Sequence, residues 1–202
     1  MEQRDYLKDI SEIKNLMNRS SQFISLSGLA GVLAGVYALA GAFAANRILE
    51  NYPDDFNTFQ SHGMQLLLLI AAIVLVLSVA TAVLLTYIKA QKSGEKIWNS
   101  ASKRLLSNFM IPLASGGIFS LLLLKDGHYG LIVPAMLLFY GLACVSASKY
   151  TFRDVRYLGI TMVLLGLAAT AFPAYGLIFW ALGFGLCHIV YGAIMHFKYD
   201  QD

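Results

Sequence analysis

Six apolar blocks recur along the chain, each about as long as a helix that crosses a lipid bilayer. A hydrocarbon core of about 30 Å requires about 20 apolar helical residues. Hydrophobic residues make up 57% of the 202 residues and charged residues only 13%, an excess typical of membrane proteins. We therefore predict an all-α polytopic membrane protein. The predicted spans are residues 23–45, 64–88, 105–124, 129–147, 157–172 and 174–197.

The fifteen lysines and arginines predict how these spans are oriented, because short loops rich in them stay on the cytoplasmic side. Thirteen lie before the first span, in the loops after the second and fourth spans, or after the sixth. Arg47 and Lys125 are the two exceptions. We expect a bacterial inner-membrane protein with both termini in the cytoplasm, including a short tail at 199–202. The net charge of +3 gives no indication of a nucleic-acid partner.

An even number of spans predicts three helical hairpins in the domain 23–198. The residues YGLI at 129–132 recur at 175–178, each time after an outer turn, so the last two hairpins form a weak parallel repeat. Pro112, followed by Gly116 and Gly117, predicts a kink or local unwinding in the third span, since proline removes a backbone hydrogen bond.

Glycines seven residues apart predict close helix packing in three of the spans. Seven residues are two helical turns, so each pair lies on one face, and small residues there let helix backbones approach closely in lipid. We interpret these glycines as packing residues and expect the first span to lie inside the bundle. The candidate packing residues are Gly28, Gly31, Gly35, Gly159, Gly166, Gly185 and Gly192.

Part of the glycine pattern, at the end of the chain, resembles a known family. The pattern comprises residues 158–160 (LGI), 166–167 (GL), Pro173, residues 182–183 (LG) and 191–192 (YG), set within repeated hairpins. In this it resembles the short-repeat, six-helix bacterial membrane proteins related to an acid-resistance protein. The resemblance implies a small multi-pass bacterial membrane protein linked to stress resistance, and it implies no catalytic residue.

Chemistry-bearing residues are sparse inside the spans. No Asp, Glu, Lys or Arg falls near the middle of a span, which argues against an ion-coupled transporter. His188 lies halfway along the sixth span, where a hydrogen bond to a neighbouring helix is the favoured role. Pairing Ser115 with His188 as an intramembrane serine protease is a remote alternative. His62 and His128 have no metal-ligand spacing, so we assign no metal site and no cofactor.

The amino-terminal residues predict an amphipathic cytoplasmic helix over 1–22. Tyr6, Ile10, Ile13 and Met17 follow helical spacing, while charged residues of both signs fill the other positions. Mixed charge disfavours a pure lipid-surface role. Packing on the membrane domain and docking of a cytoplasmic protein, or of a second copy, remain open.

These observations predict a protein that is not an enzyme. We expect a membrane scaffold, or a regulatory or stress-related anchor, that contacts the lipid bilayer and a cytoplasmic partner or a second copy. The alternative is a small transporter or channel for an uncharged or weakly acidic solute. Its candidate polar interior comprises His188, Ser115, Tyr37 and Tyr140, together with Ser120 and Thr161.

Overall fold

The computed structural model describes residues 22–51, 62–94 and 96–200 and contains six helices long and apolar enough to cross a membrane. This confirms the prediction of an all-helical protein with six candidate spans. The helical segments are α2 (Gly28–Glu50), α4 (Met64–Lys92), α5 (Ser100–Lys125), α6 (Ile132–Ala147), α7 (Arg153–Ala171), α8 (Gly176–Trp180) and α9 (His188–Tyr199). A π-helical segment, Ala181–Cys187, joins α8 to α9 and makes them one continuous span.

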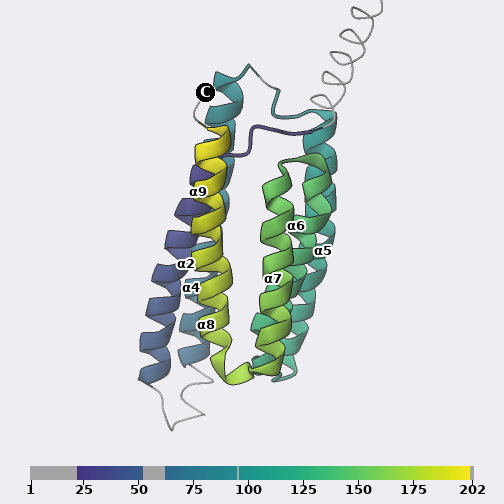
Figure 1. Ribbon diagram of the computed structural model, residues 1–202. Coiled ribbons are helices and arrows are strands. Elements are labelled where there is room, and N and C mark those ends of the chain that lie inside the picture. The colour runs from purple at the N-terminus through teal and green to yellow at the C-terminus, as the bar shows by residue number, and fades with distance from the viewer. Residues whose placement is uncertain (1–21, 52–61, 95, 201–202) are drawn as a thin grey trace, which may run out of the picture.

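The six spans form two rows of three helices (Figure 1). In one row α2 lies between α4 and the last span, and in the other α6 lies between α5 and α7. The most extensive contact of α7 is with α6, and that of α9 is with α2. The last two spans are sequential neighbours, yet each packs mainly on a helix outside its own predicted hairpin. The central place of α2 within its row follows from its small residues, which admit helices on two sides.

Local sequence sets where several helices begin. Asn99 and Ser102 form a reciprocal capping box at the start of α5, with Asn99 Oδ1 accepting from Ser102 N at 2.8 Å and Ser102 Oγ accepting from Asn99 N at 2.9 Å. Gly127, at a φ of +77°, allows the turn that leads out of α5. Short 3-10 turns at Tyr129–Leu131 and Pro173–Tyr175 precede α6 and α8, and each includes the tyrosine with which the repeated YGLI begins.

Two expectations about helix geometry are altered by the structure. The third span is α-helical throughout Ser100–Lys125, with Pro112 inside it, so it is not locally unwound. The interruption lies in the last span instead, where the seven residues 181–187 are π-helical. The helices α4 and α5 also extend beyond the predicted apolar blocks, and the added residues at their ends include Lys89, Lys92 and Arg104.

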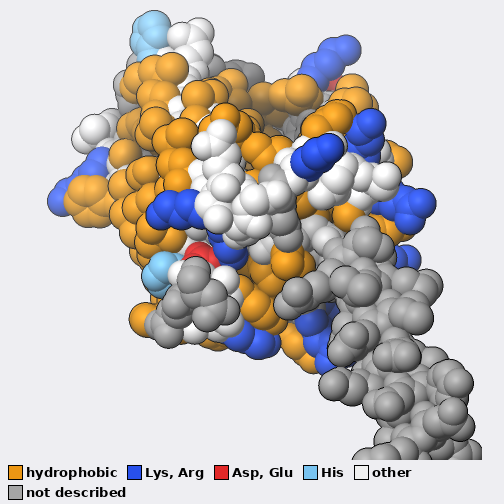
Figure 2. All heavy atoms as spheres, turned by 90° about the horizontal axis from the view of Figure 1, so that it is seen from above, with side chains coloured by type: hydrophobic (Ala, Val, Ile, Leu, Met, Phe, Trp, Pro, Cys, Tyr) orange, Lys and Arg blue, Asp and Glu red, His pale blue; other side chains and the backbone are white. Residues whose placement is uncertain are grey.

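The described ends of the chain lie at the same end of the bundle, as six crossings require. Of the described lysines and arginines, only Arg47 and Lys125 lie at the opposite end. We call the end that holds Gln22 and Asp200 the basic end. Figure 2 views this end and shows lysine and arginine side chains around its rim. The flanks are apolar, and α4 in particular buries only Ala90, which suits a helix surrounded by lipid.

Candidate functional site

Glycines bring the first and last spans into backbone contact. A Cβ atom added at Gly192 would lie 2.6 Å from Val32 N and 2.8 Å from Gly28 O. A Cβ atom added at Gly35 would lie 2.6 Å from Gly185 O. These distances leave no room for any side chain, and the obstructing atoms belong to backbones that cannot rotate away. The crossing of α2 with the last span therefore depends on glycine on both helices.

The remaining packing candidates lie at two different contacts. Gly31 faces Gly192, because a Cβ atom added at Gly31 would lie 3.1 Å from the Cα atom of Gly192. On α7, an added Cβ at Gly159 would lie 2.7 Å from Gly141 O, and one at Gly166 would lie 2.9 Å from Leu138 N. The α7 glycines therefore pack on α6, and Gly141 is a partner that the seven-residue spacing did not reveal.

The α2–α9 crossing sets up a polar network at the basic end. Gly28 N, the first amide of α2, donates to Asp200 Oδ2 at 2.9 Å, whereas the preceding Ser27 side chain makes no capping hydrogen bond. His196 Nδ1 lies 3.1 Å from the same carboxylate oxygen. A carboxylate placed at a helix N-terminus satisfies a free amide and interacts favourably with the helix dipole. Asp200, the last described residue, therefore caps the N-terminus of α2.

Lys89 of α4 completes this network. Its ammonium group forms an ion pair with Asp200 Oδ1 and donates to Leu26 O at 3.0 Å and to Tyr199 O at 3.2 Å. Burial raises the pKa of Asp200, but hydrogen bonds from Lys89, His196 and Gly28 outweigh this, and the pKa lies below its ordinary value. The side chain of Asp200 is only 9% exposed, so this ion pair is largely removed from solvent screening.

A short segment of chain before α2 is fastened across the same end. Phe23 N donates to Tyr150 O at 2.8 Å, and Thr151 Oγ1 donates to Phe23 O at 2.8 Å. Phe23, Ser25 and Thr151 are all buried. We call residues 22–27 the amino-terminal strap. It links the row that contains α2 to the row that contains α6 and α7, and Figure 1 shows it running between them.

Aromatic and charged side chains join α7 to α9 beside the strap. The rings of Phe152 and Tyr199 stack with centroids 3.9 Å apart, and Lys89 lies 5.4 Å from the centroid of Phe152. Asp154 accepts from Tyr199 Oη at 2.7 Å and from Lys198 Nζ at 3.0 Å. The two rows of helices are thus joined at the basic end by contacts more polar than those along their lengths.

Deep in the bundle, Tyr140 of α6 and His188 of α9 form a hydrogen bond of 2.7 Å between Tyr140 Oη and His188 Nε2. The other ring nitrogen, Nδ1, lies 3.0 Å from Gly183 O. A carbonyl only accepts hydrogen bonds, so Nδ1 carries the proton and Nε2 accepts from the tyrosine. The buried ring also packs against Phe184. Both nitrogens of His188 are satisfied by the protein itself.

The carbonyl that meets the histidine belongs to Gly183, within the π-helical segment Ala181–Cys187 that ends directly before His188. A π-helix shifts the backbone hydrogen-bond register, and such segments recur at functional sites. Gly183 cannot be replaced without a collision, because an added Cβ would lie 2.4 Å from Leu137 Cδ2. Leu137 belongs to the central cluster with Leu158, Met162 and Ala169.

The other candidate polar residues lie apart from His188. Tyr37 Oη is 3.4 Å from Thr81 Oγ1, at the contact between α2 and α4, and Thr161 Oγ1 is 3.1 Å from Tyr191 Oη. Ser115 is exposed and donates to Ile111 O of its own helix at 2.8 Å. Ser115 and His188 form no hydrogen bond with each other, so the structure lacks the dyad that the protease alternative requires.

The predicted docking residues, the histidines considered as metal ligands and the cysteines lie outside the contacts described so far. Tyr6, Ile10, Ile13 and Met17 lie outside the described residues. Within the described ranges, no three histidine, cysteine, aspartate or glutamate side chains gather where they could hold a metal ion. Cys144 and Cys187 are both free thiols.

Sequence reasoning missed the residues that build the basic end. Lys89 counted only among the basic residues of a loop, Asp200 lay in the predicted tail, and Thr151 was not singled out. The signal that was present is the absence of a capping box at the start of this helix, since Ala30 stands where a Glu or Gln would complete a box with Ser27. The partner, 172 positions away, has no local sequence signature.

No protein-family model, curated protein or solved structure matches this chain. The resemblance to the short-repeat acid-resistance family therefore stays a prediction.

Proposed function

We propose that this protein is a non-enzymatic membrane scaffold or regulatory anchor that presents its amino-terminal segment to a cytoplasmic partner. In this proposal the basic end faces the cytoplasm of a bacterium, the spans lie in the inner membrane, and the role is linked to stress. The distribution of lysine and arginine supports this orientation. The amphipathic pattern of residues 1–22 supports a docking role for that segment.

The observation that carries the proposal is the fastening of the strap. Phe23 is bound through both its amide and its carbonyl, Leu26 is bound by Lys89, and Gly28 is bound by Asp200. Contacts from three separate places, namely the connection between α6 and α7, the helix α4 and the end of α9, thus hold the strap that follows residues 1–21. A rigid attachment point lowers the conformational freedom that a docking segment loses on binding, which favours presentation to a partner.

The environment of His188 supports the same proposal. A residue that handles a solute or a proton needs a free nitrogen or an exchangeable water, whereas both nitrogens here are engaged by Tyr140 and Gly183. His188 is 8% exposed, and its ring packs against the rings of Tyr140 and Phe184. This arrangement favours a structural role for the histidine between the two rows.

The test is recovery of cytoplasmic proteins with the purified full-length protein after deletion of residues 2–18. We expect the deletion to abolish recovery of a partner while the membrane domain keeps its thermal stability. Ile13→Asp should do the same, because it places a charge on the predicted apolar face. Asn15→Asp adds the same charge at a polar position and should retain the partner. A differently tagged second copy distinguishes self-association from a heterologous partner.

Recovery of the same set of proteins with the wild type, the deletion and Ile13→Asp would contradict the docking proposal. Loss of partner with Ile13→Asp and Asn15→Asp alike would assign the effect to charge rather than to an apolar docking face.

The second candidate function is a small transporter or channel for an uncharged or weakly acidic solute. It is favoured by the π-helical segment beside His188 and by the division of the bundle into two rows, because transporters place interrupted helices at the membrane midplane. Proteoliposome swelling in glycerol and in acetate tests this function. Permeation above that of protein-free liposomes that is lost in His188→Leu would support it over the scaffold.

A further inference from the structure

The outer face of α7 carries a basic hollow that none of the interactions described above uses. It has a volume of about 340 Å³ and is lined by Arg153, Arg156, Tyr157 and Ile160. Both arginines are exposed, and among the described residues neither has an ion-pair partner. Asp154, the nearest carboxylate in sequence, is occupied by Lys198 and Tyr199. The hollow therefore holds two positive charges that the described part of the protein does not neutralise.

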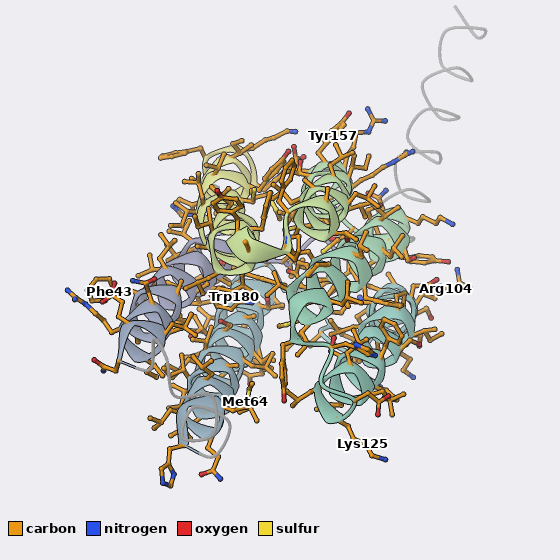
Figure 3. The ribbon with its side chains drawn as sticks, turned by 90° about the horizontal axis from the view of Figure 1, so that it is seen from below. Phe43, Met64, Arg104, Lys125, Tyr157 and Trp180 are labelled. Carbon is orange, nitrogen blue, oxygen red and sulfur yellow. The ribbon has the colours of Figure 1, made fainter. Side chains whose placement is uncertain are left out.

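The order of side chains along α7 matches the layers of a lipid monolayer. Arg153 and Arg156 lie in the first turn, at the basic end, where headgroups are found. Tyr157 follows, a residue type enriched at the membrane interface, and Figure 3 shows it pointing outward from the bundle. Ile160 lies one turn deeper, where the apolar part of the helix begins, and it is also exposed.

We propose that this hollow binds the phosphate headgroup of an anionic phospholipid in the leaflet at the basic end. Guanidinium groups recognise phosphate through paired hydrogen bonds, and basic pockets at this depth in membrane proteins accept anionic lipid headgroups. Tyr157 donates a further hydrogen bond at the level of the glycerol backbone. Ile160 contacts the start of an acyl chain, a contact that a free phosphate ion does not need, so the lining favours a lipid over a soluble anion.

The test measures binding of phosphatidylglycerol to the full-length protein in phosphatidylcholine nanodiscs, by native mass spectrometry across a series of phosphatidylglycerol fractions. We expect the Arg153→Gln, Arg156→Gln double variant to bind phosphatidylglycerol about 25-fold more weakly, from about fivefold for each arginine. The matched control is Lys92→Gln with Arg104→Gln, which removes two exposed charges at the same end but outside the hollow. This control should weaken binding by less than about threefold, because its two charges attract the anionic lipid only through long-range electrostatics.

Two further measurements separate the recognition chemistry from bulk charge. Arg153→Lys with Arg156→Lys keeps both charges but loses the paired geometry, so it should bind at an intermediate strength. An excess of inorganic phosphate should leave the bound lipid in place. All four side chains of the hollow's lining lie on the outer face of α7, so thermal stability should be unchanged in these variants.

Equal binding by the wild type and the double glutamine variant would overturn the proposal, as would equal losses in that variant and in its control. Displacement of the lipid by inorganic phosphate would assign the hollow to a soluble anion instead. If the double glutamine variant does not fold, the single change Arg156→Lys, which keeps the charge, replaces it. It should still weaken phosphatidylglycerol binding, by a smaller factor.

Discussion

The carboxylate of Asp200 accepts a hydrogen bond from the backbone amide of Gly28 at 2.9 Å, although the two residues are 172 positions apart. One contact thereby joins the beginning of the first span to the end of the last. The same carboxylate binds Lys89 of α4, so three helices of one row meet at a single side chain. This carboxylate holds together the ends of α2, α4 and α9, and several measurable consequences follow from it.

Removal of this carboxylate should destabilise the bundle. Asp200→Ala deletes a helix cap and leaves the ammonium group of Lys89, whose side chain is 20% exposed, without its counter-ion. We expect a loss of about 2 to 3 kcal/mol in the free energy of unfolding, measured in mixed detergent micelles. Asp126→Ala removes an exposed carboxylate at the opposite end and serves as the control. Equal losses in the two variants would contradict the capping role.

The contribution of Asp200 should depend on pH in one direction. Its pKa is lowered from 3.8 in the folded protein, so protons bind more readily to the unfolded chain. The stabilisation is therefore fully present above pH 3.8 and is lost as the pH falls through the lower, folded pKa. The difference in melting temperature between wild type and Asp200→Asn should be constant at higher pH and should shrink below pH 3.8. A difference that grows on acidification would refute this sign.

Backbone contact at the α2–α9 crossing predicts a large effect from a single methyl group. The Cβ added by Gly192→Ala would lie 2.6 Å from Val32 N and 2.8 Å from Gly28 O, so the two helices must separate. We expect a loss of about 2 kcal/mol or more. Gly117→Ala is the control because an added Cβ there meets nothing within 4 Å. It should be neutral or slightly stabilising, since alanine favours helix over glycine. The melting temperatures of the two variants test this difference, and an equal effect of both would contradict it.

The hydrogen bond between Tyr140 and His188 predicts a cost for removing one hydroxyl group. Tyr140→Phe leaves His188 Nε2 buried without a partner, which should cost about 1 to 3 kcal/mol. Tyr37→Phe makes the same chemical change in the other row, where the bond to Thr81 is long, at 3.4 Å, and should cost less than about 1 kcal/mol. The two melting temperatures are compared in the same detergent, and the reverse order would count against the assigned roles.

The strap should loosen when its side-chain hydrogen bond is removed. Thr151→Val keeps the shape of the side chain but no longer donates to Phe23 O. We expect amide exchange over residues 23–27 to accelerate by roughly tenfold, as the loss of one buried hydrogen bond predicts. Thr170→Val removes a hydroxyl that bonds only within its own helix, to Gly166 O, and should leave exchange in the strap unchanged. Unaltered exchange in Thr151→Val would mean that other contacts suffice to hold the strap.

Some features of the candidate site were within reach of the sequence and others were not. The depth and neutral hydrogen bonding of His188 could be predicted, because an apolar span offers a histidine few partners other than tyrosine, serine, threonine or a backbone carbonyl. The partner Tyr140 stood among several equivalent polar residues. The π-helical segment at Ala181–Cys187 carries no proline and no distinctive motif. Pro112 therefore led us to predict an irregular helix in the third span rather than in the last one.

The six apolar helices and the positions of their charged ends could be predicted from the order of residues along the chain. In lipid every backbone amide must find its partner within its own helix, so the length and composition of each block suffice to predict a span. Which helices are neighbours could be learned only from the folded bundle. Lipid tails solvate every apolar helix face almost equally well, and hydrophobicity therefore does not choose partners. That choice rests on backbone approach at glycines such as Gly28 and Gly192, and on a few polar contacts such as Asp200 with Lys89, whose members lie far apart in the chain.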